Sequence, residues 1–553
     1  MKKLLLFLCL IFCFQISAQE DAWVFIKDKP QETSFLNNPI SILTQRSLDR
    51  RSKLNIPLDS KDVPVDEAYY NQLNNDKTVT VLGKSKWLNA VHVQGEVAAI
   101  NTLITNYSFI ASIEFANKSL NLNGKSKGKT ITPNHYNKLN ETLTDFNYGA
   151  TDNQIKMLKG DYLHQQELTG EGQIIAIIDA GFPNVNTLDA FSRIRDNNQI
   201  LGGYNFADRN DNFYTRNSHG THVLSSIAAY IKDEYVGTAP DAKFYLFISE
   251  ISETETVLEE TLWVEAAERA DSLGVDVINT SLGYTTYDNP NHNHTYADMD
   301  GKTTFISRGA EIGASRGLLL VNAVGNDGAN SWKYMGAPAD APSVISVGAV
   351  NSSGNIASFS SFGPTSDGRI KPEILGKGQN PALIDYSSGE ITTSSSGTSF
   401  SSPIMAGLIA CLNQSEGFLL KSSLKKSSEN YNDYLKTSIY ESADKFKNPT
   451  DQHGYGIPNF ETALNSYIAS LSLIQDELIN FKISPNPVQY SFTISTDDFE
   501  DVSIQIYTIL GKKVFEKAAV TSKNIDISFL NTGIYLLKIS KGNQQKNIKI
   551  IKQ

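Results

Sequence analysis

Three short stretches of the chain supply an acid, an imidazole and a hydroxyl, the groups that an activated serine nucleophile needs. They are residues 177–181 with Asp179, residues 218–223 with His219 and residues 397–399 with Ser399. A serine hydroxyl is a weak nucleophile near neutral pH and requires a base within hydrogen-bond reach to take its proton. An imidazole suits this task because its pKa lies near the working pH, and a carboxylate on its other nitrogen selects the tautomer and stabilises the imidazolium. The three stretches together indicate nucleophilic catalysis by a serine.

Ser399 precedes an apolar run, residues 404–410, that predicts a buried helix. Pro403 is expected in the first turn of this helix, where a missing N–H group is tolerated. Unpaired backbone N–H groups at a helix start favour an anion beside the serine. Taken singly, Ser399 would be read as a helix N-cap, and Asp179 and Asn326 as turn residues. The combination of the three groups favours the catalytic interpretation.

The elements that must position these residues alternate between strands and helices. Apolar strands are expected at 172–179, 243–248, 275–282, 317–324 and 344–350, and helices at 151–167, 222–230, 255–273 and 308–316. Strands that are apolar on both sides and separated by helices are typical of an α/β fold, a doubly wound parallel sheet with helices on both faces. Functional residues collect at the carboxyl ends of such strands, where Asp179, Ser281 and Asn326 are expected.

With the motifs at 237–240, 278–283 and 323–328, these stretches resemble the subtilisin-like serine proteases, the subtilases of peptidase family S8, over about residues 154–464. The resemblance implies the subtilisin-like, mostly parallel α/β sheet and a serine endopeptidase (EC 3.4.21.-) that hydrolyses peptide bonds through an acyl-enzyme. It implies that Asp179 orients His219, that His219 is the general base and then the acid, and that Ser399 is the nucleophile.

The same resemblance implies the residues that bind substrate and the oxyanion. The side-chain amide of Asn326 would form the oxyanion hole beside the backbone N–H of Ser399. The substrate-binding residues it implies are Ser281, Leu282 and Gly283, which would pair with the substrate backbone, and Ala323, Val324 and Gly325 on the pocket wall. Two positions depart from the family pattern, Ala180 in place of Thr and Phe400 in place of Met. Neither departure removes a reacting group.

Metal binding stays open in the sequence. His222 is interpreted as structural, and a zinc pair with His219 lacks a third ligand at plausible spacing. The chemistry requires no cofactor. The loop 284–302 either shapes substrate access or is a solvated insertion, which is slightly favoured. This loop carries Asp288, His292, His294, Asp298 and Asp300. Its carboxylates, or those of Asp196, Asp208 and Asp211, could bind a structural calcium ion, as in many subtilases.

The flanking sequence predicts a secreted precursor. The expected parts are a signal peptide at 1–18, a propeptide-like α/β domain at 19–120, a linker with the activation cleavage at 121–150, a catalytic domain at 151–466, a linker at 467–480 and a small all-β domain at 481–553. The α/β domain resembles subtilase propeptides, with a permanent accessory domain as the alternative. Cys411 is alone in the mature chain, so no internal disulfide is expected, and no membrane span is expected there.

The C-terminal domain carries motifs at 483–487, 509–514 and 532–538 that resemble the sorting domain read by the type IX secretion system of Bacteroidetes-type bacteria. The resemblance implies export by signal peptide and then type IX secretion, to the medium or the cell surface. The alternative is a sandwich that binds substrate or wall carbohydrate. The expected partners are protein or peptide substrates, the chain's own pro-domain and the type IX machinery.

The net charge of −11 implies no broad basic surface, which argues against nucleic acid as a partner. Three rival interpretations of function stay open. They are a catalytically silent binding protein on a subtilase scaffold, a maturation protease of narrow specificity, and a sedolisin-type acid peptidase. The last uses a glutamate base, so His219 argues against it.

Overall fold

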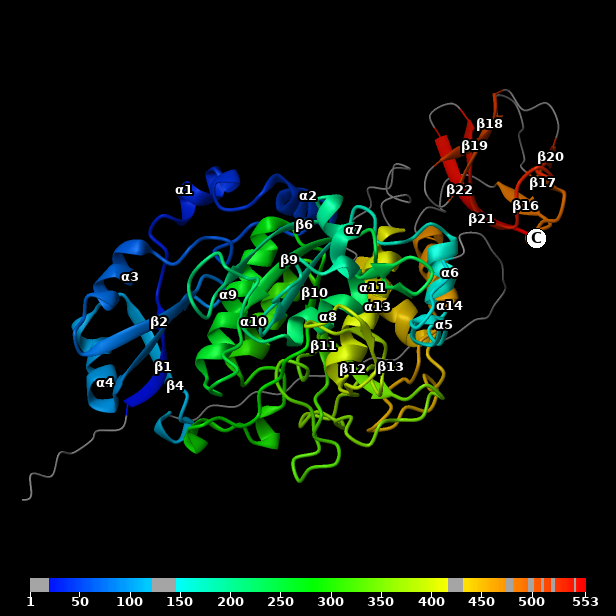
Figure 1. Ribbon diagram of the computed structural model, residues 1–553. Helices are drawn as coiled ribbons and strands as arrows, with labels where there is room; N and C mark the ends of the chain where they lie inside the picture. Colours follow the sequence, from blue (N-terminus) through cyan, green and yellow to red (C-terminus); the bar gives the residue numbers. More distant parts are fainter. Residues whose placement is uncertain are drawn as a thin grey trace, which may run out of the picture.

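The structure is a computed structural model (Figure 1). It describes residues 19–121, 146–415, 431–473, 481–495, 502–508, 512–518, 523–541 and 544–553. These residues form an N-terminal α/β unit, a central α/β unit and a C-terminal β unit, each with a hydrophobic core of its own. The expected signal peptide and most of the expected linker 121–150 lie outside the described residues.

A seven-stranded parallel sheet forms the centre of the molecule. Its spatial order is β13 (Ile374–Lys377), β12 (Ile345–Val350), β11 (Leu319–Ala323), β10 (Val277–Thr280), β5 (Ile174–Asp179), β9 (Lys243–Ile248) and β6 (Ile200–Asn205). Ile178 lies in register with Thr280 on one side and with Phe247 on the other, so these three strands end at the same edge. The predicted doubly wound α/β fold is confirmed.

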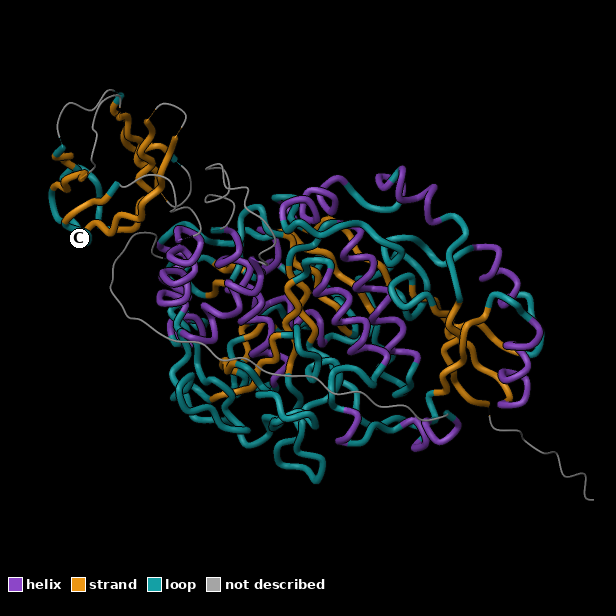
Figure 2. Tube along the Cα trace, turned by 180° about the vertical axis from the view of Figure 1, so that it is seen from behind, coloured by secondary structure: helices purple, strands orange, loops and turns teal. Residues whose placement is uncertain are grey.

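Helices cover both faces of this sheet (Figures 1 and 2). One face carries α8 (His219–Ala228), α11 (Thr398–Gln414), α13 (Tyr431–Glu441) and α14 (Phe460–Leu473), and the other carries α9 (Leu258–Leu273) and α10 (Phe305–Ser315). Along β5, Ile175 and Ile177 enter the first core, whereas Ala176 and Ile178 enter the second. A strand buried on both faces must be apolar at every position, which explains the unbroken apolar run.

Several helix boundaries differ from the sequence-based expectation. The helix expected at 222–230 already begins at His219. The one expected at 151–167 is two short helices, α5 (Asp152–Lys156) and α6 (Gly160–Gln165), because Lys159 adopts a left-handed φ of 57° between them. The prediction that Pro403 lies in a first turn is wrong: α11 begins at Thr398, so Pro403 lies inside the helix. In addition, α14 extends into the stretch 467–480 that was expected to be a linker.

The N-terminal unit is a four-stranded antiparallel sheet whose order is β2 (Val79–Ser85), β3 (Ala90–Glu96), β1 (Gln19–Ile26) and β4 (Ile110–Phe115). Helix α4 (Val97–Asn106) packs on one face, with α3 (Glu67–Asn74) beside β2. The sheet packs on helices α9 and α10: Trp23 stacks on Phe305 at a centroid distance of 4.7 Å and donates to Thr261 Oγ1 at 2.9 Å.

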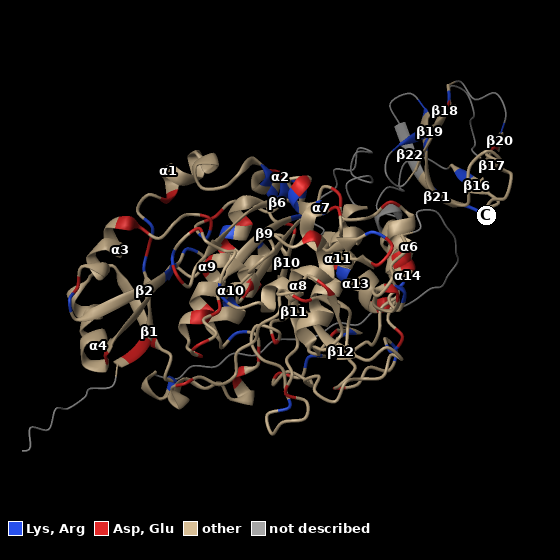
Figure 3. Ribbon diagram, in the orientation of Figure 1, with Lys and Arg blue, Asp and Glu red and all other residues tan. Residues whose placement is uncertain are grey.

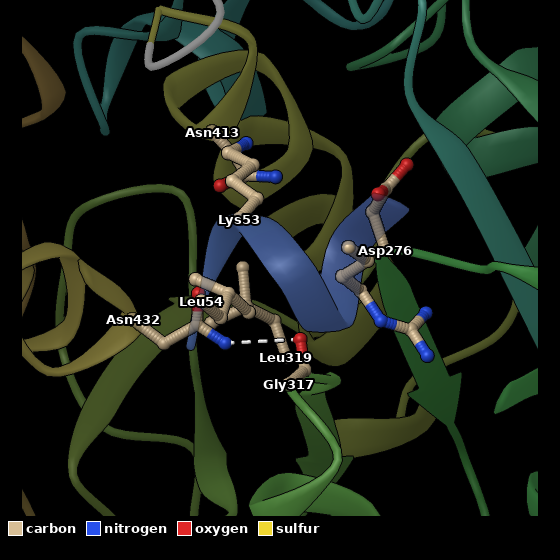
Figure 4. A pocket seen from close by; sticks show the side chains of 8 residues that line it. Lys53, Leu54, Asp276, Gly317, Leu319, Asn413 and Asn432 are labelled. Carbon is tan, nitrogen blue, oxygen red and sulfur yellow. Dashed lines mark hydrogen bonds between the residues drawn. The ribbon is translucent and has the colours of Figure 1, made fainter. Parts of the chain in front are cut away.

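A helical arm, which the sequence did not reveal, extends from the N-terminal unit to the base of the central sheet. It contains α1 (Glu32–Asn37) and α2 (Gln45–Lys53), and Figure 3 shows the basic residues gathered on α2. Buried Arg51 binds Asp62 at 2.8 Å and Asp271 at 2.7 Å, and Arg50 also binds Asp271. A small pocket beside α2 is lined by residues of both the arm and the central unit (Figure 4).

The C-terminal unit consists of two antiparallel sheets around one core. Their orders are β16 (Lys482–Ser484), β17 (Ser491–Ser495) and β20 (Asn524–Asp526), and β19 (Lys513–Lys517), β18 (Val502–Thr508), β21 (Gly533–Lys541) and β22 (Gln544–Lys552). Buried Val502, Ile504 and Ile506 alternate with more exposed residues, as expected for a half-buried strand. Across the part of the chain that the structure describes, no helix is long and apolar enough to cross a membrane.

Candidate active site

The residues predicted to do chemistry lie at one edge of the central sheet. Asp179 ends β5, Ser281 follows β10 directly and Asn326 follows β11. Helices α8 and α11 begin with His219 and with Thr398-Ser399. The sheet order changes direction around β5, and ligands of doubly wound proteins bind at the carboxyl ends of strands next to such a point.

Asp179 and His219 form a direct hydrogen bond. His219 Nδ1 donates to Asp179 Oδ1 at 2.7 Å, and the acid is fully buried, whereas the imidazole side chain is 29% exposed. The backbone N–H of Ala180 donates to the same carboxylate oxygen at 2.7 Å. Because Nδ1 carries the proton, Nε2 is the nitrogen left to accept one, as a general base requires.

The two carboxylate oxygens of Asp179 differ in their hydrogen bonding. Asp179 Oδ2 is buried and has no hydrogen-bond partner among the described residues. Ala180, where the sequence departs from the family pattern, offers no hydroxyl to this oxygen. The carboxylate therefore bonds through Oδ1 alone, to the imidazole and one backbone group.

Glu250, just beyond β9, is a third acid near this pair, and the sequence analysis did not single it out. Tyr284 donates its hydroxyl to Glu250 Oε2 at 2.8 Å. Burial, with the charge of Asp179, raises the pKa of Glu250 to about 7. Burial alone lowers the pKa of His219, but the charges of Asp179 and Glu250 outweigh it, so that pKa is raised. The feature of the sequence that could have identified Glu250 is its position near the carboxyl end of a predicted strand.

Ser399 is the second residue of α11 and is 9% exposed. Its hydroxyl donates to the backbone carbonyl of Ser281 at 3.3 Å. The ring of Phe400 lies 5.9 Å from the ring of His219, so the second departure from the family pattern places an aromatic wall beside the imidazole. The ring of His222 lies 5.9 Å from the ring of Tyr386, in an edge-to-face arrangement.

Asn326 lies beside the start of α11, where the sequence predicts the pocket for a negatively charged oxygen. Asn326 Oδ1 accepts from the backbone N–H of Thr398 at 2.8 Å and from its hydroxyl at 3.0 Å, which leaves Nδ2 free to donate. A Cβ built on Gly397 would lie 3.5 Å from Asn326 Nδ2 and 3.7 Å from the backbone nitrogen of Ser399. Both donors therefore border the space that the missing side chain of Gly397 leaves open.

The two segments predicted to bind substrate lie on either side of Asn322. Its side-chain amide donates to the carbonyl of Leu282 at 3.1 Å and to that of Ala323 at 2.7 Å. Ser281 and Ala323 are buried, Leu282 is half-buried and Gly283 is exposed. Val324 is buried, and Gly325 has a φ of +113° that favours glycine. The backbone at Gly283 is thus accessible for pairing with an extended peptide.

The loop 284–302 packs against the N-terminal unit. His292 is buried and bonds to Glu20 at 3.0 Å, and Asp298 forms an ion pair with Lys118 at 2.8 Å. The interpretation as a solvated insertion is therefore wrong for these residues. Among the described residues no group of three or more His, Cys, Asp or Glu side chains could hold a metal ion. The possible structural calcium ion stays a prediction.

The fold and this grouping of side chains define the class of protein: a serine peptidase of the subtilisin type. The chain belongs to the subtilase family, whose sequence profile matches residues 170–457. The profile of the peptidase S8 propeptide domain of Bacteroidota matches residues 21–133, and that of the secretion system C-terminal sorting domain matches residues 482–553.

Curated relatives agree with this assignment. Subtilisin NAT from Bacillus subtilis subsp. natto and subtilisin E from Bacillus subtilis (strain 168) are each 30% identical over 293 residues, which span 52% of this chain and 67% of each relative. Subtilisin from Bacillus pumilus is 29% identical, over 52% of this chain and 93% of that protein. The solved structure of the prenylagaramide maturation protease PagA matches with a TM-score of 0.42 and 23% identity, over 56% of this chain and 98% of that one.

The flanking matches settle what the outer units are. The N-terminal unit is a propeptide, which implies that the peptidase is made as a zymogen. The C-terminal unit is a sorting domain of the type IX system, which indicates secretion or the cell surface and implies contact with that machinery. The accessory-domain and carbohydrate-binding alternatives are therefore not retained.

Proposed function

We propose that the protein is a secreted serine endopeptidase that works through an acyl-enzyme, with Asp179, His219 and Ser399 as its catalytic residues. The observation that carries the proposal is the 2.7 Å bond between Asp179 and His219 at the sheet edge where Ser399 and the oxyanion pocket also lie. A peptide strand would pair with residues 281–283 and lie along residues 323–325.

In the first half of the reaction, Ser399 Oγ attacks the carbonyl carbon of the substrate while His219 Nε2 takes its proton. The carbonyl oxygen becomes an oxyanion that accepts from Asn326 Nδ2 and from the backbone N–H of Ser399. The carbon–nitrogen bond then breaks, and His219 gives the proton to the leaving amine. In the second half a water molecule attacks the acyl carbon while His219 Nε2 takes its proton. The ester bond to Ser399 Oγ then breaks, His219 returns the proton to that oxygen, and the carboxylic acid product leaves.

The precursor would be kept inactive by its propeptide and cleaved within 121–150. The propeptide packs on α9 and α10, the helices that cover one face of the catalytic sheet. Cleavage in that stretch would separate the propeptide from the catalytic unit and leave the two associated through their packed surfaces.

The test compares the precursor, residues 19–553, with its Ser399→Ala variant and with Ser346→Ala. Ser346 is a buried serine on β12 whose hydroxyl donates to Glu373 at 2.7 Å, so it is a matched control. We expect the parent and the control to shed the N-terminal unit, cleave casein and take a fluorophosphonate label, and Ser399→Ala to do none of these. If the parent stays intact and unlabelled, the silent binding protein is the better account. Activity confined to pH below about 5 would favour an acid peptidase with a carboxyl base.

A further inference from the structure

Ser281 and Ser399 are joined by two reciprocal hydrogen bonds. The hydroxyl of Ser399 donates to the carbonyl of Ser281 at 3.3 Å, and the hydroxyl of Ser281 donates to the carbonyl of Ser399 at 2.8 Å. The second bond is buried and connects the end of β10 to the first turn of α11. It acts on the backbone of the residue that supplies the nucleophile, without touching the reacting hydroxyl.

The carbonyl of Ser399 can accept this bond because of Pro403. In an α-helix, the carbonyl of residue 399 would accept from the N–H of residue 403. Proline has no N–H group, so this carbonyl lacks its helical partner although it lies inside α11. A buried carbonyl without a partner is costly, and the hydroxyl of Ser281 supplies the missing donor from a different element.

Further side chains hold the Ser281 hydroxyl in this role. Asn279 Nδ2 donates to Ser281 Oγ at 3.2 Å, so the hydroxyl proton is directed away from Asn279 and towards Ser399. Asn279 is oriented in turn by Ser402, whose hydroxyl donates to Asn279 Oδ1 at 2.9 Å. These hydrogen bonds form a chain from Ser402 on α11, through Asn279 and Ser281 at the end of β10, to Ser399 on α11.

We propose that the hydroxyl of Ser281 is a positioning group for the nucleophile, acting on the helix carbonyl that Pro403 leaves without a donor. The inference rests on the proposed function and deepens it: the resemblance assigns Ser281 to substrate binding through its backbone, whereas the proposal gives its side chain a separate role. Loss of the hydroxyl would let the first turn of α11 shift and misplace Ser399 Oγ, which lowers the rate of attack and leaves substrate affinity unchanged.

The test compares Ser281→Thr with Ser281→Val in the full-length precursor, since these two side chains have the same shape and differ only by the hydroxyl. We expect Val to react about tenfold more slowly than Thr, in kcat and in the rate of fluorophosphonate labelling, with KM within about twofold. Equal rates for Thr and Val would overturn the proposal. Ser346→Ala should label at the parent rate.

The same pair is then compared in a Pro403→Ala background. Alanine restores an N–H donor at residue 403, so the Ser399 carbonyl no longer depends on Ser281 and the difference between Thr and Val should fall below about threefold. A tenfold difference that persists there would overturn the link to Pro403. A parent that takes no label contradicts the proposed function itself, and this is seen before any variant is compared.

Discussion

At the scale of single residues, the surroundings of His219 set the pH range in which it can act as a base. The charges of Asp179 and Glu250 raise the pKa of the imidazole against the opposing effect of burial. Glu250 is held in place by the hydroxyl of Tyr284. A base must be unprotonated, so activity should be lost as the pH falls through the raised pKa of His219.

Replacing Glu250 by Gln should therefore move the acid limb of the pH profile of kcat/KM to lower pH. Without this charge the pKa of His219 falls, so the imidazole stays neutral further into the acid range, while the plateau rate changes by less than about threefold. Glu311→Gln is the control, because Glu311 on α10 bonds to Ser343 and is not among the groups that shift the pKa of His219 or of Glu250. A limb that stays in place or moves to higher pH would contradict this account of Glu250.

Replacing Gly397 by Ala should block the oxyanion pocket while the fold is kept. Gly397 has an extended backbone with φ 166°, which alanine can adopt, but the new methyl group would lie between Asn326 Nδ2 and the N–H of Ser399. We expect kcat to fall by roughly 10²–10³-fold, the loss known for one oxyanion donor in subtilisin, a relative of this chain. The melting temperature serves as the check on folding. A variant with normal kcat would place the oxyanion elsewhere.

At the scale of secondary-structure elements, α9 is the helix on which the propeptide docks. Glu268 on this helix accepts from the hydroxyl of Ser85 at 2.6 Å and from the backbone N–H groups of Lys86 at 3.1 Å and Trp87 at 2.9 Å. One carboxylate thereby binds the turn between β2 and β3, and hydrogen bonds to a charged group are stronger than neutral ones.

Glu268→Ala should therefore shorten the time for which the cleaved propeptide inhibits the enzyme. Loss of three bonds to a carboxylate predicts dissociation at least about tenfold faster, measured as the lag between self-cleavage and casein hydrolysis. Glu311→Ala is the matched control, because Glu311 on α10 bonds to Ser343 within the catalytic unit. An unchanged lag in Glu268→Ala would show that other contacts control release.

At the scale of the whole molecule, each of the three units has a hydrophobic core, and the units differ in how they are joined. The propeptide contacts helices α9 and α10, where Trp23 stacks on Phe305 and the buried Arg50 and Arg51 pair with Asp271. It also contacts the loop 284–302, through the ion pair of Lys118 with Asp298. The sorting domain meets the catalytic unit through Leu536, which packs into the central hydrophobic core, and through Lys549, which donates to the carbonyl of Asn465 at 3.5 Å. The catalytic unit is therefore expected to work without the sorting domain.

Deleting residues 481–553 should leave the peptidase active and stop its export. We expect casein cleavage within about twofold of the parent for the purified, activated protein, because the residues of the candidate active site all lie in the catalytic unit and the sorting domain has a hydrophobic core of its own. In a host with a type IX system, the truncated chain should stay inside the outer membrane. Full-length Ser399→Ala should be exported like the parent, which separates export from activity. Export of the truncated chain would contradict the sorting role.

Much of the site was determined by the sequence alone. The motifs around Asp179, His219, Ser399 and Asn326 each depend on a few neighbouring residues, and the apolar run of β5 indicates a parallel sheet because both of its faces are buried. The carboxyl edge of that sheet then brings the motifs together. Strands β6 and β13 were not predicted. Strand β6 contains two glycines and is partly exposed at the edge of the sheet, and β13 has only four residues.

Tertiary structure alone decided the features that depend on partners distant in the chain. Glu250 becomes part of the site because β9 lies beside β5, and the helix α2 matters because its arginines reach Asp271. The hydroxyl of Ser281 meets the carbonyl of Ser399 across 118 residues of sequence. Local patterns reveal a residue's chemistry and its element, but the donor that satisfies a buried carbonyl is chosen by packing. For that reason the sequence predicted the candidate catalytic residues, and only the folded structure showed which distant groups bond to them.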